Sequence, residues 1–101
     1  MEIQQLTAQM NSFVRSQGWY ERTSNRPQIP RNLAISLTLE AAEILELFQW
    51  NEDFKREELQ SELADVALYL FQLASVAEID LEQAVLNKLA VNHQRKWEQD
   101  A

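Results

Sequence analysis

Two pairs of carboxylates at helical spacing are the residues of this sequence best suited to chemistry. Glu40 and Glu43 form the first pair, and Glu62 and Asp65 form the second. Residues three apart share one face of a helix. Both pairs lie among apolar residues, where an ionised carboxylate is costly unless a positive charge meets it. On neighbouring helices the four acids would repel one another. A divalent cation removes that conflict, and oxygen-only ligands suit Mg²⁺ or Mn²⁺.

A second set of side chains has the properties that bind a phosphorylated ligand. Lys88, Asn92 and Arg95 share one arc of a predicted helix, where the two cations suit phosphate groups. Trp50 and Tyr69 are predicted on the same arcs as the acidic pairs, and their rings suit stacking on a base. Carboxylates that hold Mg²⁺ beside cations are the usual parts for phosphoryl transfer. Together these residue types indicate a nucleotide as the ligand.

The elements that must position these residues are predicted to be helices, in an all-α fold. Glycine and proline are confined to residues 18–30, and no stretch shows sustained strand alternation. Gly18 is expected to end the first helix and Pro30 to begin the second. Asp53 and Asp80 are the expected N-caps of the third and fourth. The four helices are expected at about residues 2–17, 30–50, 56–77 and 80–97.

Composition indicates one small domain over residues 1–101 that associates with a second copy. The chain is 46% apolar, and almost every residue from 63 to 77 is apolar apart from the strip that continues the acidic pair. A helix that is apolar on most sides must be surrounded, and a partner subunit is the simplest supply. The net charge of −7 argues against binding of nucleic acid polymers or anionic membranes.

Other sequence features favour a cytoplasmic protein. The chain has no cysteine, which excludes disulfides and thiolate sites. We expect no signal peptide and no membrane span, because no apolar run approaches about 20 residues.

Four segments of the chain resemble the MazG-like nucleoside triphosphate pyrophosphohydrolases, and within them the dCTP pyrophosphatase group. The resemblance extends over about residues 2–97. It is carried by the pairing of E-x-x-E with E-x-x-D, by Phe-Gln-Trp, and by Lys-x-x-x-Asn-x-x-Arg. The four segments are Pro30-Arg-Asn-Leu33, the run from Glu40 to Trp50, Glu62-Leu-Ala-Asp65, and the run from Asn87 to Arg95.

The resemblance implies an all-α, four-helix fold completed by dimerisation, in homodimers or homotetramers. It implies Mg²⁺-dependent cleavage of a nucleoside triphosphate between the α and β phosphates, with metal-activated water attacking the α-phosphorus. The metal ligands and catalytic residues would be Glu40, Glu43, Glu62 and Asp65. The substrate contacts would be Lys88, Asn92 and Arg95, with Arg31 and Asn32 as helpers, and the base-pocket aromatics Trp50, Tyr69 and Trp19.

The sequence departs from the dCTP group near the predicted base pocket. Gln28 lies where those proteins usually have histidine, and the stretch between Trp19 and Pro30 is longer. Both departures bear on which base is preferred. The sequence is therefore compatible with dCTP or with other, including modified, deoxynucleoside triphosphates.

Two other classes of protein are compatible with parts of the pattern. A di-iron helical bundle normally needs two Glu-x-x-His motifs, which the single histidine, His93, cannot supply. A non-catalytic helical interaction module would leave the acidic strips solvated and use the apolar third helix to bind a partner. In that case Lys88 and Arg95 would only complement a helix dipole, and Trp50 and Tyr69 would pack in a core or an interface.

Overall fold

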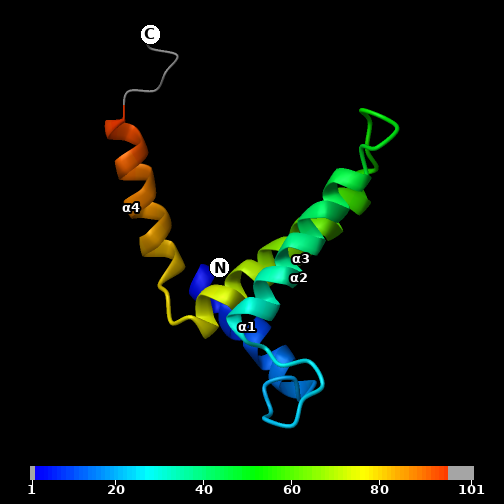
Figure 1. Cartoon of the computed structure of the whole chain (residues 1–101). Helices are drawn as coiled ribbons and strands as arrows, with labels where there is room; N and C mark the ends of the chain where they lie inside the picture. Colours follow the sequence, from blue (N-terminus) through cyan, green and yellow to red (C-terminus); the bar gives the residue numbers. More distant parts are fainter. Residues whose placement is uncertain (1, 96–101) are drawn as a thin grey trace.

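The computed structural model describes residues 2–95, and this part of the chain is all-α (Figure 1). The prediction of an all-α, four-helix fold is confirmed. The predicted start and end residues agree within one or two residues, apart from the end of the second helix. The predicted end of the fourth, near residue 97, lies outside the described residues. The helices are α1 (Ile3–Ser16), α2 (Pro30–Glu46), α3 (Arg56–Val76) and α4 (Leu81–Gln94).

Local sequence signals account for most helix termini. Gly18 follows α1 with a φ of 74°, a left-handed conformation that suits glycine. Pro30 occupies the first turn of α2, where a missing N–H costs nothing. At the start of α4 the Asp80 carboxylate accepts a hydrogen bond of 3.1 Å from the Gln83 amide. The predicted N-cap at Asp53 is wrong, because α3 begins after Lys55 without a side-chain cap.

The predicted extension of the second helix to Trp50 is also wrong. After Glu46 the backbone changes to 3₁₀-type turns, in which the amides of residues 47–49 each donate a hydrogen bond to the carbonyl three residues earlier. Phe48 then packs edge to face on Phe54, with 5.7 Å between ring centroids. This contact closes the connection that turns the chain from α2 back into α3.

Helix α3 is the central element, because it packs against both α1 and α2. The buried apolar side chains lie where α1, the start of α2 and the end of α3 meet: Met10, Val14, Leu33 and Ala74. Beyond this core the first part of α3 and the second part of α2 continue side by side as a two-helix arm (Figure 1).

Helix α4 leads away from the other three helices (Figure 1). None of its residues is buried in this single chain, and Val85, Leu86 and Leu89 are about half exposed. No helix within residues 2–95 is both long and apolar enough to cross a membrane. The apolar side chains of α4 therefore lack the covering that a packed helix has.

Candidate metal and nucleotide site

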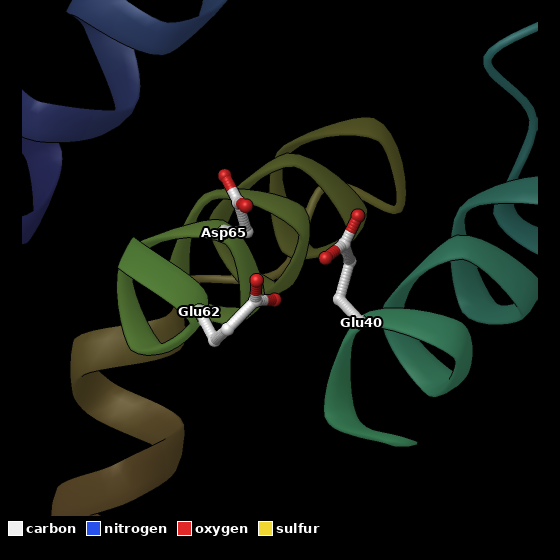
Figure 2. Close-up of side chains that lie close together, drawn as sticks. All are labelled: Glu40, Glu62 and Asp65. Atoms are coloured by element: carbon white, nitrogen blue, oxygen red, sulfur yellow. The ribbon is translucent and has the colours of Figure 1, made fainter. Parts of the chain in front are cut away.

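Three of the four predicted metal ligands meet between α2 and α3. Glu40 of α2 points across the gap toward Glu62 and Asp65, which lie one turn apart on α3 (Figure 2). One carboxylate oxygen from each of the three lies within 4.8 Å of the other two. Residues 62 and 65 share a face of α3 because they are three apart. The antiparallel packing of α2 then brings the third carboxylate to them.

Charge in this cluster is poorly compensated within the described residues. One oxygen of Glu40 and one of Glu62 are buried without a hydrogen-bond partner. A hydrogen bond with the Glu43 carboxyl, burial and the neighbouring acids together raise the pKa of Glu40 from 4.5 to about 7. A hydrogen bond with Glu43 is also the main cause that raises the pKa of Glu62. The cluster is thus built for a bound cation or for shared protons.

Glu43 differs from the other three acids in its exposure. Its side chain is exposed and is not one of the three that converge, yet its carboxyl lies close enough to hydrogen-bond with those of Glu40 and Glu62. A carboxylate at the rim of the cluster is accessible to water and to a ligand.

The predicted cationic strip lies on α4 and at its C-cap, Arg95, away from the acidic cluster of the same chain. Lys88 and Arg95 are exposed and Asn92 is half-buried. Their helix leads away from the α2–α3 arm that carries the acids (Figure 1). The single chain therefore does not bring the predicted phosphate-binding residues and the carboxylates together.

The predicted base-pocket aromatics lie in three different places. Tyr69 is half-buried on α3, one turn beyond Asp65 on the same face. Trp50 lies in the connection at the far end of the two-helix arm and is 90% exposed. Trp19 lies in the loop at the opposite end, packed edge to face on Phe13 at 5.8 Å between ring centroids. Within one chain, the two tryptophans do not meet.

The two predicted helpers in the first turn of α2 differ in what they contact. Asn32 donates a hydrogen bond of 2.9 Å to the Pro27 carbonyl, and thereby fixes the end of the preceding loop. Arg31 is exposed and donates to the Asn32 side chain at 3.3 Å. Their positions indicate a structural role for Asn32 and a solvent-facing cation at residue 31.

A buried amide that sequence reasoning left without a role lies on the face of the carboxylates. Gln72 is only 3% exposed and donates a hydrogen bond of 2.6 Å to the side chain of Gln28. Its position, seven residues after Asp65, puts Gln72 on the helix face of Glu62, Asp65 and Tyr69. The signal that could have singled it out is a glutamine within an otherwise apolar run.

The fold and the site together define a class of protein. It is an all-α protein in which carboxylates at E-x-x-E and E-x-x-D spacing, on two antiparallel helices, form a cluster suited to a divalent cation. Residues 35–101 match the model of the MazG-like family. The chain belongs to the MazG-like family.

Individual relatives agree with this membership. The chain is 43% identical over 76 residues to dCTP pyrophosphatase 1 of Mus musculus, a match that covers 65% of this chain and 45% of that protein. The Homo sapiens protein of the same name is 42% identical over 76 residues, with the same coverage. The matched stretch is thus less than half the length of these relatives.

A phage protein and a solved structure extend the comparison. A dATP/dGTP diphosphohydrolase of Salmonella phage PMBT28 is 49% identical over 37 residues, which is 37% of this chain and 13% of that protein. The crystal structure of a pyrophosphatase from Archaeoglobus fulgidus has a TM-score of 0.77 at 34% identity. It covers 90% of this chain and 88% of the other. The arrangement of helices is therefore shared with a protein described as a pyrophosphatase.

Proposed function

We propose that the protein is a Mg²⁺-dependent nucleotide pyrophosphohydrolase. In this proposal it cleaves deoxynucleoside triphosphates, dCTP or modified forms among them, to the monophosphate and pyrophosphate. The observation that carries the proposal is the convergence of Glu40, Glu62 and Asp65 oxygens within 4.8 Å of one another. The names of the relatives, a dCTP pyrophosphatase and a dATP/dGTP diphosphohydrolase, support this class of substrate.

The residues of the cluster fit a divalent cation. Three carboxylates supply only oxygen, which hard cations such as Mg²⁺ and Mn²⁺ prefer. Two of these oxygens are buried without a hydrogen-bond partner in the described part of the chain. The pKa of Glu40 is raised by its hydrogen bond with Glu43, by burial and by the neighbouring acids, and this agrees with the crowding of carboxyl groups that a divalent cation would relieve. When bound, the ion supplies charge neutralisation for phosphate oxygens and lowers the pKa of water.

Glu43 is the proposed general base. Its exposed carboxylate at the rim of the cluster is positioned to take a proton from the attacking water. The water oxygen forms the new bond to the α-phosphorus, and the bond between the α-phosphorus and the oxygen that bridges to the β-phosphate breaks. Pyrophosphate leaves with the electron pair of that bond, and the water proton passes to Glu43.

A second copy of the chain would complete the site. The radius of gyration is 16.6 Å, whereas a compact domain of this length has about 13 Å. The half-exposed apolar residues of α4 give a second chain a surface to cover. In a homodimer or homotetramer, Lys88, Asn92 and Arg95 of one chain would bind the phosphates held at the carboxylates of another. In the same assembly Trp50 and Tyr69 would border the base.

The test is an incubation of the purified protein with a panel of canonical and modified deoxynucleoside triphosphates. Each reaction is run with Mg²⁺, with Mn²⁺ and with chelator, and the products are identified by mass. We expect metal-dependent formation of monophosphate and pyrophosphate. In ¹⁸O-labelled water, the label should appear in the monophosphate, because the attack is at the α-phosphorus.

Two results would contradict the proposal in different ways. Diphosphate with orthophosphate would keep a nucleotide hydrolase but reject attack at the α-phosphorus. Absence of turnover, together with a melting temperature that Mg²⁺ and Mn²⁺ leave unchanged, would reject the metal site. That second result would favour a helical interaction module.

A further inference from the structure

A chain of polar contacts ties the loop of residues 17–29 to the helix that carries two of the carboxylates. Gln72 of α3 donates to the Gln28 side chain at 2.6 Å, and Gln28 donates to the Arg26 carbonyl at 2.5 Å. The guanidinium of Arg26 lies 5.6 Å from the ring centroid of Trp19. The path therefore runs from α3, through two amides, to Trp19, which the family resemblance predicts to lie in the base pocket.

The Arg26 carbonyl fixes the donor-to-acceptor direction of this series of hydrogen bonds. The Arg26 carbonyl can only accept a hydrogen bond, so Gln28 must face it with Nε2. The Oε1 atom of Gln28 then faces Gln72, which must offer its own Nε2. Each side-chain amide is thus held in one orientation. Reversal of either amide would break at least one bond of the chain.

The burial of Gln72 makes this contact costly to lose. Gln72 is 3% exposed, on the same stretch of α3 as the buried core residue Ala74. A buried amide left without its partner retains the full cost of removal from water. The Gln72 amide therefore favours one position of residue 28, and with it one position of the loop end.

The geometry of α3 connects this anchor with the acidic cluster. Gln72 lies seven residues beyond Asp65 on the same face, and Tyr69 lies between them. Seven residues of α-helix span about 10.5 Å. In the proposed site we place the nucleotide along α3, with its phosphates at the carboxylates and its base toward Gln72. In that orientation the anchored loop would border the base.

A second polar link holds the start of the loop. The Tyr20 hydroxyl donates to Asn11 at 2.5 Å, and Asn11 donates to the Ser75 hydroxyl at 3.0 Å. Between the two links, a hollow of about 430 Å³ is lined by Trp19 and Arg26, together with Gln17, Gly18, Ser24 and Asn25. The loop thus borders an open hollow and is linked to α3 near both of its ends, directly through Gln28 and through Asn11 of α1 at its start.

We propose that Gln72 is a positioning residue for substrate selection. Through Gln28 it holds the Trp19 and Arg26 loop at a fixed distance from the carboxylates of α3, and so determines which base is accepted. This inference rests on the proposed nucleotide pyrophosphohydrolase activity. It assigns base discrimination in this chain to the Gln28–Gln72 amide pair.

The test compares Gln72→Leu with Gln60→Leu, an exposed glutamine of the same helix, as the matched control. For the wild type and both variants, kcat and KM are measured on the four canonical deoxynucleoside triphosphates. We expect Gln72→Leu to raise KM for the preferred nucleotide about tenfold. We expect kcat to change by less than about threefold. The differences in kcat/KM among the four nucleotides should become smaller. The control should keep the wild-type values.

Limited trypsin digestion supplies a readout independent of activity. Arg22 is exposed in the middle of the loop, and cleavage after it should accelerate in Gln72→Leu but not in Gln60→Leu. A substitution in the core can unfold the chain, so a second variant removes the same hydrogen bond from its other side. This variant is Gln28→Leu, at a half-buried residue of the loop. It should reproduce the same shifts in KM and in cleavage. The double variant should be no worse than either single variant, since both remove one contact.

Distinct results separate this inference from the function on which it rests. If the wild type discriminates among bases and folded Gln28 and Gln72 variants retain its KM values and ranking, the positioning role is wrong while the activity remains. A loss confined to kcat, or a wild type without base preference, would overturn the role as well. No pyrophosphate release from the wild type would overturn the proposed function itself, and this inference with it.

Discussion

The acidic cluster and the cationic strip are both predicted from sequence spacing, yet they meet different conditions in the structure. The carboxylates of Glu40, Glu62 and Asp65 converge because α2 and α3 pack against each other within one chain. The strip of Lys88, Asn92 and Arg95 lies on a helix that leads away from that pair. Both sets of residues have regular helical spacing, but only the acidic residues are brought together within one chain.

The difference teaches what each region needs in order to function. In the proposed site the acids need only a cation, since three of the four carboxylates already converge. The strip on α4 needs a packing partner, because Val85, Leu86 and Leu89 are about half exposed on its surface. Exposed apolar surface is the driving force for association. We infer that the two regions belong to one site only in an oligomer.

The largest expected effect is at the acidic cluster. Asp65→Asn removes a negative charge and one oxygen proposed to coordinate the metal, while it preserves the shape of the side chain. Groups that only support a metal ligand are worth about 10- to 100-fold, so we expect kcat/KM to fall about 100-fold or more. The melting temperature should also lose its rise with Mg²⁺. Glu46→Gln is the matched control, because Glu46 is exposed and outside the cluster.

Equal activity of Asp65→Asn and wild type, with the same Mg²⁺ dependence, would remove Asp65 from the ligand set. In that case the convergence of the three acids would contribute to helix packing and not to metal binding. Loss of activity in Glu46→Gln as well would indicate that total negative charge matters, rather than the cluster.

The next effect tests whether α4 serves another chain. The double charge reversal Lys88→Glu and Arg95→Glu should lower kcat/KM by about 10- to 100-fold, because charged hydrogen bonds to phosphate are lost. An equal mixture of this variant with Asp65→Asn should regain activity, since a mixed dimer has one intact site. About a quarter of all sites would be restored.

The mixing experiment discriminates between the two arrangements directly. If α4 supplies cations to the carboxylates of its own chain, no mixture can contain an intact site and activity stays at the level of the two variants. Lys55→Met is the control for loss of a lysine charge, because Lys55 is exposed at the start of α3.

Much of this architecture could be predicted from the sequence because its signals are local. Gly18, Pro30 and Asp80 mark helix termini by their own backbone and hydrogen-bond chemistry. The spacing of the two acidic pairs likewise places each pair on one helix face. These predictions needed only neighbours along the chain.

The features that escaped prediction depend on contacts between distant residues. The end of α2 at Glu46, rather than near residue 50, goes with packing of Phe48 on Phe54. The Gln28–Gln72 hydrogen bond joins residues 44 apart in sequence. Periodicity along one helix contains no information about either contact. The position of α4 relative to the acids was beyond prediction for the same reason.

The third effect is a pH dependence of stability in the metal-free protein. The folded-state pKa of Glu40 is about 7, raised from 4.5 chiefly by its hydrogen bond with Glu43. The folded chain therefore holds more protons than the unfolded chain between these values. The stabilisation is fully present below about pH 4.5 and is lost as the pH rises through 7. The melting temperature with chelator should fall from pH 5 to pH 8.

Metal should reverse this trend, because a divalent cation competes with protons for the same carboxylates. We expect Mg²⁺ to raise the melting temperature more at pH 8 than at pH 5. The variant Glu40→Gln, which cannot ionise, should show a shallower fall with chelator. An equal slope in this variant would place the titration elsewhere. Calorimetry across this pH range, with and without Mg²⁺, checks both expectations.

The smallest effect concerns the start of α4, where only local chemistry holds the helix. Asp80 accepts a hydrogen bond from the Gln83 amide, and loss of such a cap costs about 1 kcal/mol. Asp80→Ala should lower stability by about this amount, whereas Asp80→Asn, which retains a capping oxygen, should lose much less. Since α4 has no buried residue in the single chain, its helical start would depend on this cap and, in the proposed oligomer, on the partner chain. The cost should therefore be larger at low protein concentration, where dimers dissociate. Chemical denaturation of both variants at two protein concentrations measures it. A cost that is independent of concentration would mean that α4 is held within its own chain, and the contrast between the two regions would disappear.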